Sequence, residues 1–174
     1  MGGDDKGLVP VAGRPMIEHV IGALRPQVGT ILISANRNLE RYAHYGYPVI
    51  ADDLRDYQGP LAGVAAALGQ CTSEFLVTDL VARLLAARSA GDADAAVVHD
   101  GQRLQPVFLL LHRRVAPSLE AYLGGGGRRV DAWLGQLRAV VADFGDRATA
   151  FVNVNDPDEH RAVEAQLLSS SGAG

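Results

Sequence analysis

The sequence has little of what marks membrane, secreted or nucleic-acid-binding proteins. Its single cysteine, Cys71, excludes an internal disulfide and suits a reducing cytoplasm. No apolar run approaches the roughly 20 residues of a membrane-spanning helix, and no signal peptide is visible. The net charge is -4 and no basic cluster is longer than Arg128-Arg129, so no nucleic-acid partner is expected. These absences favour a cytoplasmic protein, and a small phosphorylated ligand would need only local positive charge.

Aromatic residues are also scarce, at 6% of 174 residues, whereas hydrophobic residues reach 48% and glycines number 20. This composition suits an aliphatic α/β core better than a β sandwich. The length is sufficient for one domain with a buried core. We predict a single domain over residues 1–168 and a flexible tail over residues 169–174.

Predicted strands and helices alternate along the chain, which favours a mostly parallel sheet covered by helices. The expected fold is therefore α/β, Rossmann-like and three-layered. Asp100-Gly101 is a turn signal that joins two strands in a hairpin, so one antiparallel element is expected beside the parallel strands. The predicted strands lie at residues 30–34, 48–50, 75–77, 94–99, 106–111, 140–144 and 151–154. The predicted helices lie at residues 38–44, 61–68, 114–123 and 130–137, and three more begin at Pro15, at Thr78 and after Asp156.

Residues 1–7, Met-Gly-Gly-Asp-Asp-Lys-Gly, resemble the end of a glycine-rich phosphate loop. Gly2 and Gly3 allow the backbone to approach an anion closely, and Lys6 supplies a point charge for a phosphate. Such a loop normally follows a strand, and the sequence shows none before it. We expect the chain to open inside its active site, with Met1 an internal loop residue.

A second irregularity lies between a predicted strand and the helix that follows it. Phe75-Leu76-Val77 runs directly into the helix starting at Thr78, although strand–helix loops usually take about 2–6 residues. Both irregularities fall where the carboxyl ends of parallel strands form the ligand crevice of an α/β sheet. We interpret them as missing loop segments rather than as an unusual fold.

Four pieces of sequence occur in a characteristic order: Gly2-Gly3-Asp4-Asp5-Lys6-Gly7, Asp52, Gly59-Pro60-Leu61-Ala62-Gly63 and Phe151-Val152-Asn153-Val154-Asn155. Together with Ser34-Ala35-Asn36-Arg37, they resemble the molybdenum cofactor guanylyltransferases, the molybdopterin-guanine dinucleotide biosynthesis protein A family of nucleotidyltransferases. The resemblance covers nearly the whole chain. It implies transfer of GMP from GTP to the terminal phosphate of molybdopterin, with release of pyrophosphate and use of Mg²⁺.

The resemblance also implies a role for each candidate residue. Lys6 would be catalytic, because it would neutralise the charge that builds up as pyrophosphate leaves. Asn153 and Asn155 alternate along a predicted strand, so both would line the molybdopterin side of the crevice. The family's magnesium-binding aspartate would fall between Val77 and Thr78, where this sequence has no such residue. The residues that would bind the nucleotide are Gly2, Gly3, Lys6, Ser34 and Asp52.

Each of these residues also has an ordinary structural explanation, and only their joint order and spacing favours the functional one. Lys6 alone would be a solvated lysine, Asp52 a turn residue, and the two asparagines polar positions on an edge strand. The alternatives are a related transferase that uses CTP or a sugar phosphate, and a non-catalytic nucleotide-binding protein. The expected partners are GTP and molybdopterin, with cofactor-delivery proteins as further candidates, and the expected state is a monomer.

Other groups of residues give weaker evidence for a function. The five histidines have no metal-ligand spacing, and Cys71, expected to be buried, has no histidine partner for acyl transfer. Gln105-Pro106 matches a region that approaches the pterin in the resembling family, or else is an ordinary loop. Arg128 and Arg129 either meet phosphates or face solvent, and the glycines at 124–127 form a flexible loop or helix cap.

Overall fold

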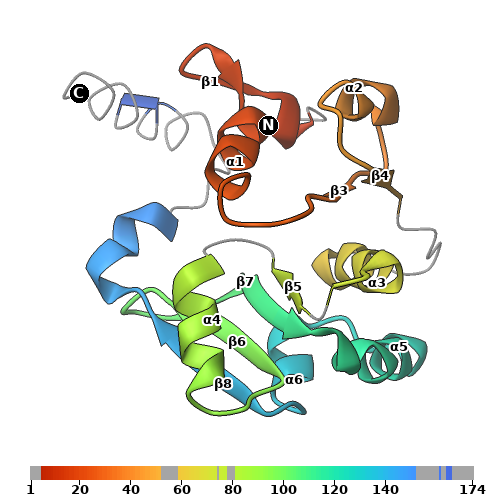
Figure 1. Cartoon of the computed structure of the whole chain (residues 1–174), viewed down its shortest axis with the longest axis vertical. Helices are drawn as coiled ribbons and strands as arrows, with labels where there is room; N and C mark the ends of the chain where they lie inside the picture. Colours follow the sequence, from red (N-terminus) through yellow and green to blue (C-terminus); the bar gives the residue numbers. More distant parts are fainter. Residues whose placement is uncertain are drawn as a thin grey trace.

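The core of the structure is a four-stranded mixed sheet (Figure 1). The computed structural model describes residues 5–51, 59–73, 75–77, 81–151, 161 and 164–165, except for the side chains of residues 75–77 and 149–150. β7 runs antiparallel to β5 and β6, whereas β6 and β8 are parallel, so three strands share one direction. The strand order is β5-β7-β6-β8, with β5 at Phe75–Val77, β6 at Ala95–His99, β7 at Leu104–His112 and β8 at Ala139–Asp143.

The predicted hairpin is confirmed, and Asp100 closes its turn between β6 and β7. The Asp100 carboxylate accepts hydrogen bonds from the backbone N–H groups of Gln102 and Arg103, each at 2.8 Å, and from Gln105 Nε2 at 2.6 Å. The Arg103 bond, followed by those of Gln105 and Gln102, lowers the pKa of Asp100 to about 2. Gln105 is only 4% exposed and lies in β7, so it belongs to a strand rather than to a loop.

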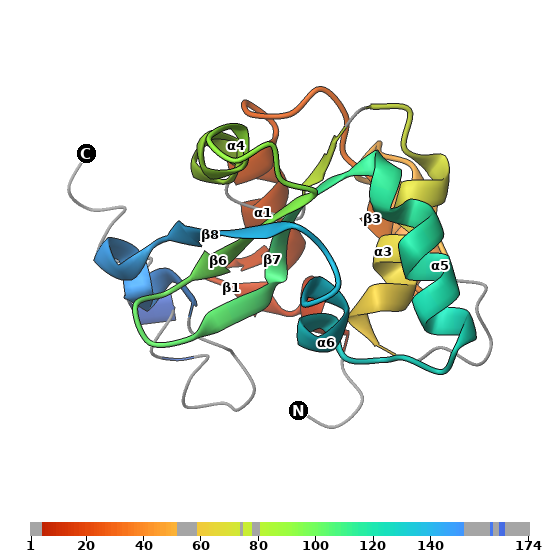
Figure 2. The ribbon, with the colours of Figure 1, turned by 90° about the horizontal axis from the view of Figure 1, so that it is seen from below.

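Helices cover both faces of the sheet, which confirms the predicted three layers (Figure 2). Successive strand residues point to opposite faces, so the two helical layers contact alternate positions of β6 and β7. One face packs Ala95, Val97, Leu109 and Leu111 against α3 Pro60–Gln70, α5 Ala116–Gly124 and α6 Val130–Leu134. The other face packs Ala96, Val98 and Leu110 against α4 Val81–Ser89 and the 3-10 helix η3 Gly145–Phe151.

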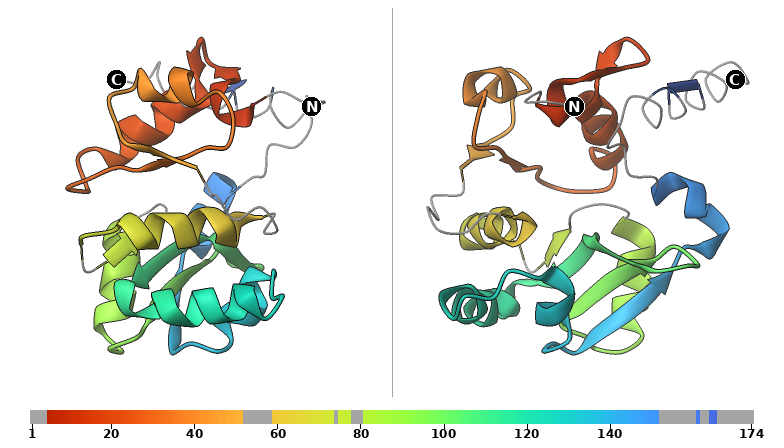
Figure 3. Two further views of the ribbon diagram at one scale, coloured as in Figure 1. Left: turned by 90° about the vertical axis from the view of Figure 1, so that its right-hand side faces the viewer. Right: turned by 180° about the vertical axis from the view of Figure 1, so that it is seen from behind.

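Residues 5–51 form a second group of elements beside this sheet, and α3 lies at the border between the two (Figure 3). β3 and β4 pair in parallel, and Leu8, Ile33 and Tyr42 form a small buried core around them. No helix in the described part of the chain is both long and apolar enough to cross a membrane. The elements are η1 Lys6–Leu8, β1 Pro10–Val11, β2 Arg14–Pro15, α1 Met16–Leu24, β3 Ile33–Ser34, α2 Leu39–Ala43 and β4 Val49–Ile50.

Several predicted boundaries are wrong, each for a local reason. The strand predicted at residues 30–34 shrinks to β3, because only Ile33 and Ser34 find ladder partners, in β4, while residues 30–32 line a cavity. The helix predicted to begin at Pro15 begins one residue later, since Pro15 has extended backbone and pairs with β1. The helix predicted at residues 130–137 ends at α6, after which Gly135 starts a turn.

The last predicted strand is wrong at its first residue, because Phe151 ends η3 instead. The Phe151 ring packs edge-on against Phe108 and Phe144, with centroid separations of 5.2 and 5.6 Å, so burial in the α4 face explains its position. Residues 152–154, the helix start after Asp156 and the predicted start at Thr78 lie outside the described residues.

The residues around α5 and α6 bind the protein's own backbone and side chains. The glycines after α5 act as a cap, with Gly126 at a φ of 86°. Arg128 donates to the carbonyl oxygens of Leu123 and Gly127, at 3.1 and 2.7 Å. Arg129 pairs with the Asp131 carboxylate. Both arginines are exposed to solvent, as one of the two predicted alternatives had it, and both also have partners within the protein.

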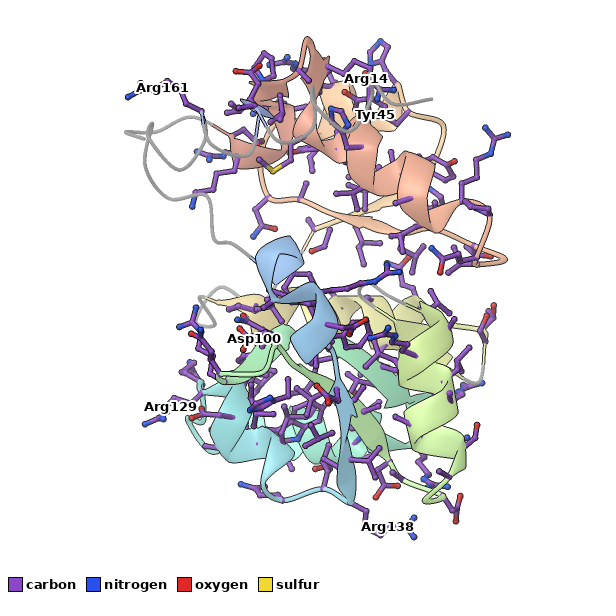
Figure 4. All side chains as sticks on the ribbon, turned by 90° about the vertical axis from the view of Figure 1, so that its left-hand side faces the viewer. Arg14, Tyr45, Asp100, Arg129, Arg138 and Arg161 are labelled. Carbon is purple, nitrogen blue, oxygen red and sulfur yellow. The ribbon has the colours of Figure 1, made fainter. Side chains whose placement is uncertain are left out.

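Asp94 joins the ends of β6, β7 and β8. Its carboxylate accepts from Arg114 Nε at 2.6 Å and from Arg138 Nε at 3.1 Å, and its carbonyl oxygen accepts from the His112 N–H at 2.9 Å. Figure 4 shows Arg138 at the end of the molecule far from Tyr45. The bonds from Arg138 first, and then from Arg114, outweigh the cost of burial and lower the pKa of Asp94 to about 2.

Replacing Asp94 with asparagine is expected to lower the free energy of unfolding at pH 7 by about 1–2 kcal/mol, because both arginines lose their charged acceptor. The folded-state pKa lies below the ordinary 3.8, so this stabilisation is present above pH 3.8 and is lost as the pH falls through about 2. Urea unfolding between pH 7 and pH 2 measures whether the unfolding free energies of the wild type and Asp94→Asn converge as the pH falls. Glu120→Gln, at an exposed side chain of α5, is the control, and a difference in unfolding free energy that stays constant with pH would contradict the assignment.

Candidate functional site

The described part of the predicted phosphate loop begins at Asp5, directly before η1. The Leu8 N–H donates to the Asp5 carbonyl oxygen at 2.9 Å, which closes the turn that carries Lys6. The Lys6 side chain is exposed. Lys6 is also the only lysine among the 16 basic residues of the sequence, the other 15 being arginines. A lysine ammonium is a compact point charge, unlike the planar guanidinium that this chain uses elsewhere.

The Asp5 carboxylate ties this loop to the segment after β3 and to α2. Tyr42 Oη donates to Asp5 Oδ1 at 2.6 Å, and Asn38 Nδ2 donates to Asp5 Oδ2 at 2.9 Å. Arg37 Nε lies 3.7 Å from Asp5 Oδ2. Asn38 adopts a φ of 53°, which asparagine tolerates better than most residues and which here precedes α2. The loop and α2 are thus joined by side-chain bonds as well as by packing.

Electrostatics keep Asp5 ionised and Tyr42 neutral. Burial acts to raise the pKa of the Asp5 carboxyl, but the bonds from Asn38 and Tyr42 and the charge of Arg37 outweigh it, and the pKa lies below its ordinary value. Burial first, and the bond to Asp5 second, raise the pKa of the Tyr42 hydroxyl above its ordinary value. The phenol therefore remains a donor at physiological pH.

A small pocket of about 240 Å³ lies beside this cluster. Its lining gathers residues from the Lys6 loop, from β3, from the segment after β3 and from α2. Ser34, the last residue of β3, and Asp5 border the same space, so the structure brings the predicted nucleotide-side serine next to the lysine loop. The lining residues are Asp5, Ser34, Ala35, Asn36, Arg37 and Tyr42.

A larger cavity of about 660 Å³ lies between β3, α3 and the four-stranded sheet. Most of its lining is apolar, with Leu61 and Val64 of α3 on one side and Leu109 of β7 on another. Ser34 borders this cavity too, and a Cβ on Gly63 would lie 2.8 Å from Ser34 Oγ, so α3 approaches β3 closely here. A mostly apolar cavity of this size with few polar groups suits a flat organic ligand.

The structure describes only some of the predicted site residues. Lys6 and Ser34 are described, and they lie on the two segments that meet at the small pocket. Pro106 of the Gln105-Pro106 pair lines the large cavity, as does Cys71, whose thiol is half-buried rather than buried as predicted. The residues outside the described part are Gly2, Gly3, Asp52, Asn153 and Asn155.

The described carboxylates do not form a metal site. No group of three or more His, Cys, Asp or Glu side chains suited to a metal occurs within the described ranges. Asp5, Asp94 and Asp100, three carboxylates with several donors around them, hold protein N–H and O–H groups rather than open positions. The metal expected from the family resemblance therefore has no fitting set of ligands among these residues.

The sequence profile of the family described as "MobA-like NTP transferase domain" matches residues 1–140. This is well over half of the chain. The chain belongs to this family. The match includes the Lys6 loop, β3 with Ser34, α3 and the β6–β7 hairpin, which are the elements around the two spaces described above.

Similar proteins extend this result beyond residue 140. A protein of Shewanella loihica named "Molybdenum cofactor guanylyltransferase" is 48% identical, over 96% of this chain and 90% of its own length. A protein of the same name from Shewanella sp. strain MR-4 is 46% identical, over 98% and 91%. The crystal structure of molybdopterin-guanine dinucleotide biosynthesis protein A from Archaeoglobus fulgidus superposes with a TM-score of 0.76 at 21% identity, covering 96% of this chain and 92% of that one. That last similarity supports the Rossmann-like fold.

The alignment with the S. loihica protein also bears on the predicted missing segment. It spans 177 positions but takes in 96% of the 174 residues of this chain, about 167 residues. Positions of the relative that have no counterpart here therefore lie inside the aligned region. A segment missing between Val77 and Thr78 would produce such a difference.

The sequence interpretation missed Tyr42 and treated Asp5 only as part of a motif. Their hydrogen bond joins residues 37 positions apart, and no local pattern indicates such a pairing. The close approach of Gly7, where a Cβ would lie 2.4 Å from Tyr42 Oη, is likewise seen only in the structure. The composition does single out the neighbouring position, because Lys6 is the only lysine of the sequence.

Proposed function

We propose that this chain transfers GMP from GTP to the terminal phosphate of molybdopterin and releases pyrophosphate. The observation that carries the proposal is the 48% identity, over 90% of its length, to a protein named "Molybdenum cofactor guanylyltransferase". The geometry is compatible with it, since one exposed ammonium, a polar pocket and a large apolar cavity lie on neighbouring elements.

In this reaction an oxygen of the pterin phosphate attacks the α-phosphorus of GTP, and the bond to the β-phosphate breaks. Negative charge builds up on the leaving pyrophosphate. Lys6 neutralises that charge, which stabilises the transition state more than the bound substrate. The backbone N–H groups around Gly2 and Gly3 contact the triphosphate in this proposal.

In this proposal the nucleotide reaches into both spaces. Ser34 borders both, so a nucleotide that extends from the Lys6 loop into the large cavity passes this hydroxyl. Asp52 then contacts the guanine or the ribose. Asn153 and Asn155 face the molybdopterin. The assignment of these last three residues rests on the family resemblance alone.

Mg²⁺ is part of the proposal through the same resemblance, and it would supply positive charge at the phosphates. Its ligands would come from outside the described residues, so no step is assigned to it. We also propose that the enzyme acts in the cytoplasm as a monomer and receives molybdopterin from delivery proteins.

The test of the function is a direct comparison of nucleotides with purified protein, molybdopterin and Mg²⁺. GTP is expected to give the guanine dinucleotide and pyrophosphate, both measured by chromatography, while CTP and UTP give at least about 100-fold lower kcat/KM, as unpaired polar groups in a base pocket would cause. Preference for CTP, or turnover with a sugar phosphate, would support the related-transferase alternative. Tight GTP binding without pyrophosphate release would support a binding protein.

A further inference from the structure

Tyr42 contacts the residues on both sides of Lys6. Its hydroxyl donates to the Asp5 carboxylate at 2.6 Å. The same oxygen faces Gly7 so closely that a Cβ there would lie 2.4 Å from it. Tyr42 itself is fixed, because it is 5% exposed and packs with Leu8 and Ile33. A rigid side chain from α2 therefore holds the backbone immediately before and after the exposed lysine.

The carboxylate in this cluster is directed toward the protein. Asp5 is 15% exposed, and it receives Asn38 on Oδ2 at 2.9 Å in addition to Tyr42 on Oδ1. Arg37 Nε adds a positive charge 3.7 Å from Oδ2. These donors occupy both oxygens and offset the negative charge, which would otherwise repel a triphosphate next to Lys6.

We propose that Tyr42 and Asp5 are positioning residues that hold Lys6 where the leaving pyrophosphate develops its charge. This rests on the proposed function, and it assigns the two residues a part in the reaction rather than in folding alone. Neither residue touches the substrate in this scheme. Their effect passes through the backbone of residues 5–7, to which the lysine side chain is attached.

The kinetic consequence follows from where Lys6 acts. GTP is held in this scheme through its base and ribose as well as through its phosphates, so a lysine displaced by a fraction of an ångström lowers the affinity for GTP only slightly. Stabilisation of the transition state depends more strongly on position. Loss of the Tyr42 hydroxyl should therefore lower kcat about tenfold and change the KM for GTP by less than about threefold.

The experiment compares Tyr42→Phe with Tyr45→Phe. Tyr42→Phe removes only the hydroxyl and keeps the buried ring. Tyr45 packs against the same small core, so Tyr45→Phe is the same chemical change without the Asp5 bond and should leave kcat unchanged. Asp5→Asn, which removes the charged acceptor at similar volume, should reproduce the fall in kcat. Circular dichroism checks that each variant is folded.

A double-mutant cycle with Lys6→Ala separates positioning from a general structural role. If Tyr42 acts through Lys6, Tyr42→Phe has no further effect on kcat once Lys6 is alanine. An equal fall in kcat in both backgrounds would overturn the proposal. So would an unchanged kcat in folded Tyr42→Phe.

A second readout does not depend on turnover. Since Lys6 is the only lysine, its acylation can be followed by mass spectrometry of one peptide, with inorganic triphosphate as the protecting ligand. Inorganic triphosphate has no base or ribose, so its binding depends on the Lys6 loop more than that of GTP does, and half-protection in Tyr42→Phe should need about tenfold more triphosphate than in the wild type or in Tyr45→Phe. Equal protection in all three proteins would overturn the proposal. If the wild type transfers no GMP but its protection depends on Tyr42, the proposed function fails and the positioning of Lys6 stands.

Discussion

Replacing Lys6 with alanine is expected to lower kcat for GMP transfer about 100- to 1,000-fold, the usual cost of removing one group that stabilises developing charge. The exposed side chain contributes little to the core, so the variant should stay folded. No neighbouring lysine can substitute, because the sequence contains no other. Steady-state kinetics of pyrophosphate release, with GTP varied at saturating molybdopterin, measures the effect.

Two controls make this result specific. Arg113→Ala removes one positive charge from an exposed position in η2, Arg113–Val115, and should leave kcat unchanged. Lys6→Arg keeps the charge but replaces a compact ammonium with a planar group, so it should restore only part of the activity. Wild-type kcat in folded Lys6→Ala would remove Lys6 from the catalytic site.

Replacing Trp133 with alanine is expected to lower the free energy of unfolding by about 3–5 kcal/mol, the usual cost of truncating a buried aromatic residue. Trp133 is 0% exposed and lies in the core that joins α3, α5 and α6 to the sheet. Its indole Nε1 donates to Ser118 Oγ at 3.3 Å, so the substitution also leaves a hydroxyl without its donor. Because this core supports the α3 side of the large cavity, GTP binding should weaken as the variant loses stability.

Urea unfolding followed by circular dichroism is the appropriate measurement, since Trp133 is the only tryptophan and its fluorescence is lost in the variant. Trp133→Phe keeps an aromatic ring in the core and should cost less than Trp133→Ala. Leu39→Ala, at a side chain 43% exposed, should change stability by less than about 0.5 kcal/mol. A loss below about 1 kcal/mol in Trp133→Ala would contradict a tightly packed core around the indole.

The fold could be predicted from the sequence where local signals agree. The Asp100-Gly101 turn predicted the β6–β7 hairpin, and small apolar residues predicted α3. Failures occur where a partner distant in the sequence decides. Only two of the five residues of the strand predicted at 30–34 find a ladder partner, because β4 itself has only two paired residues. Phe151 lies in a helix where the ring of Phe108, from β7, and the ring of Phe144, directly before η3, pack against it.

The residues of the candidate site also fall into those that local sequence signals indicate and those that depend on distant partners. Lys6 and Ser34 could be proposed as site residues from motifs, because glycine spacing and the family resemblance depend on residues that are adjacent in the sequence. The Tyr42–Asp5 bond could not, since it depends on how α2 packs against η1. The hydrogen bonds from Arg128 to backbone carbonyl oxygens could not be predicted either, because they depend on where α5 ends.

The large cavity has one further consequence, for spectroscopy. Cys71, the only thiol in the chain, lines it together with Ser34. A fluorinated tag attached to this sulfur would place a single magnetic nucleus beside the cavity of an otherwise unaltered protein. If the proposed function holds, the resonance of that nucleus would report, in real time, which substrate occupies the cavity and how quickly it departs.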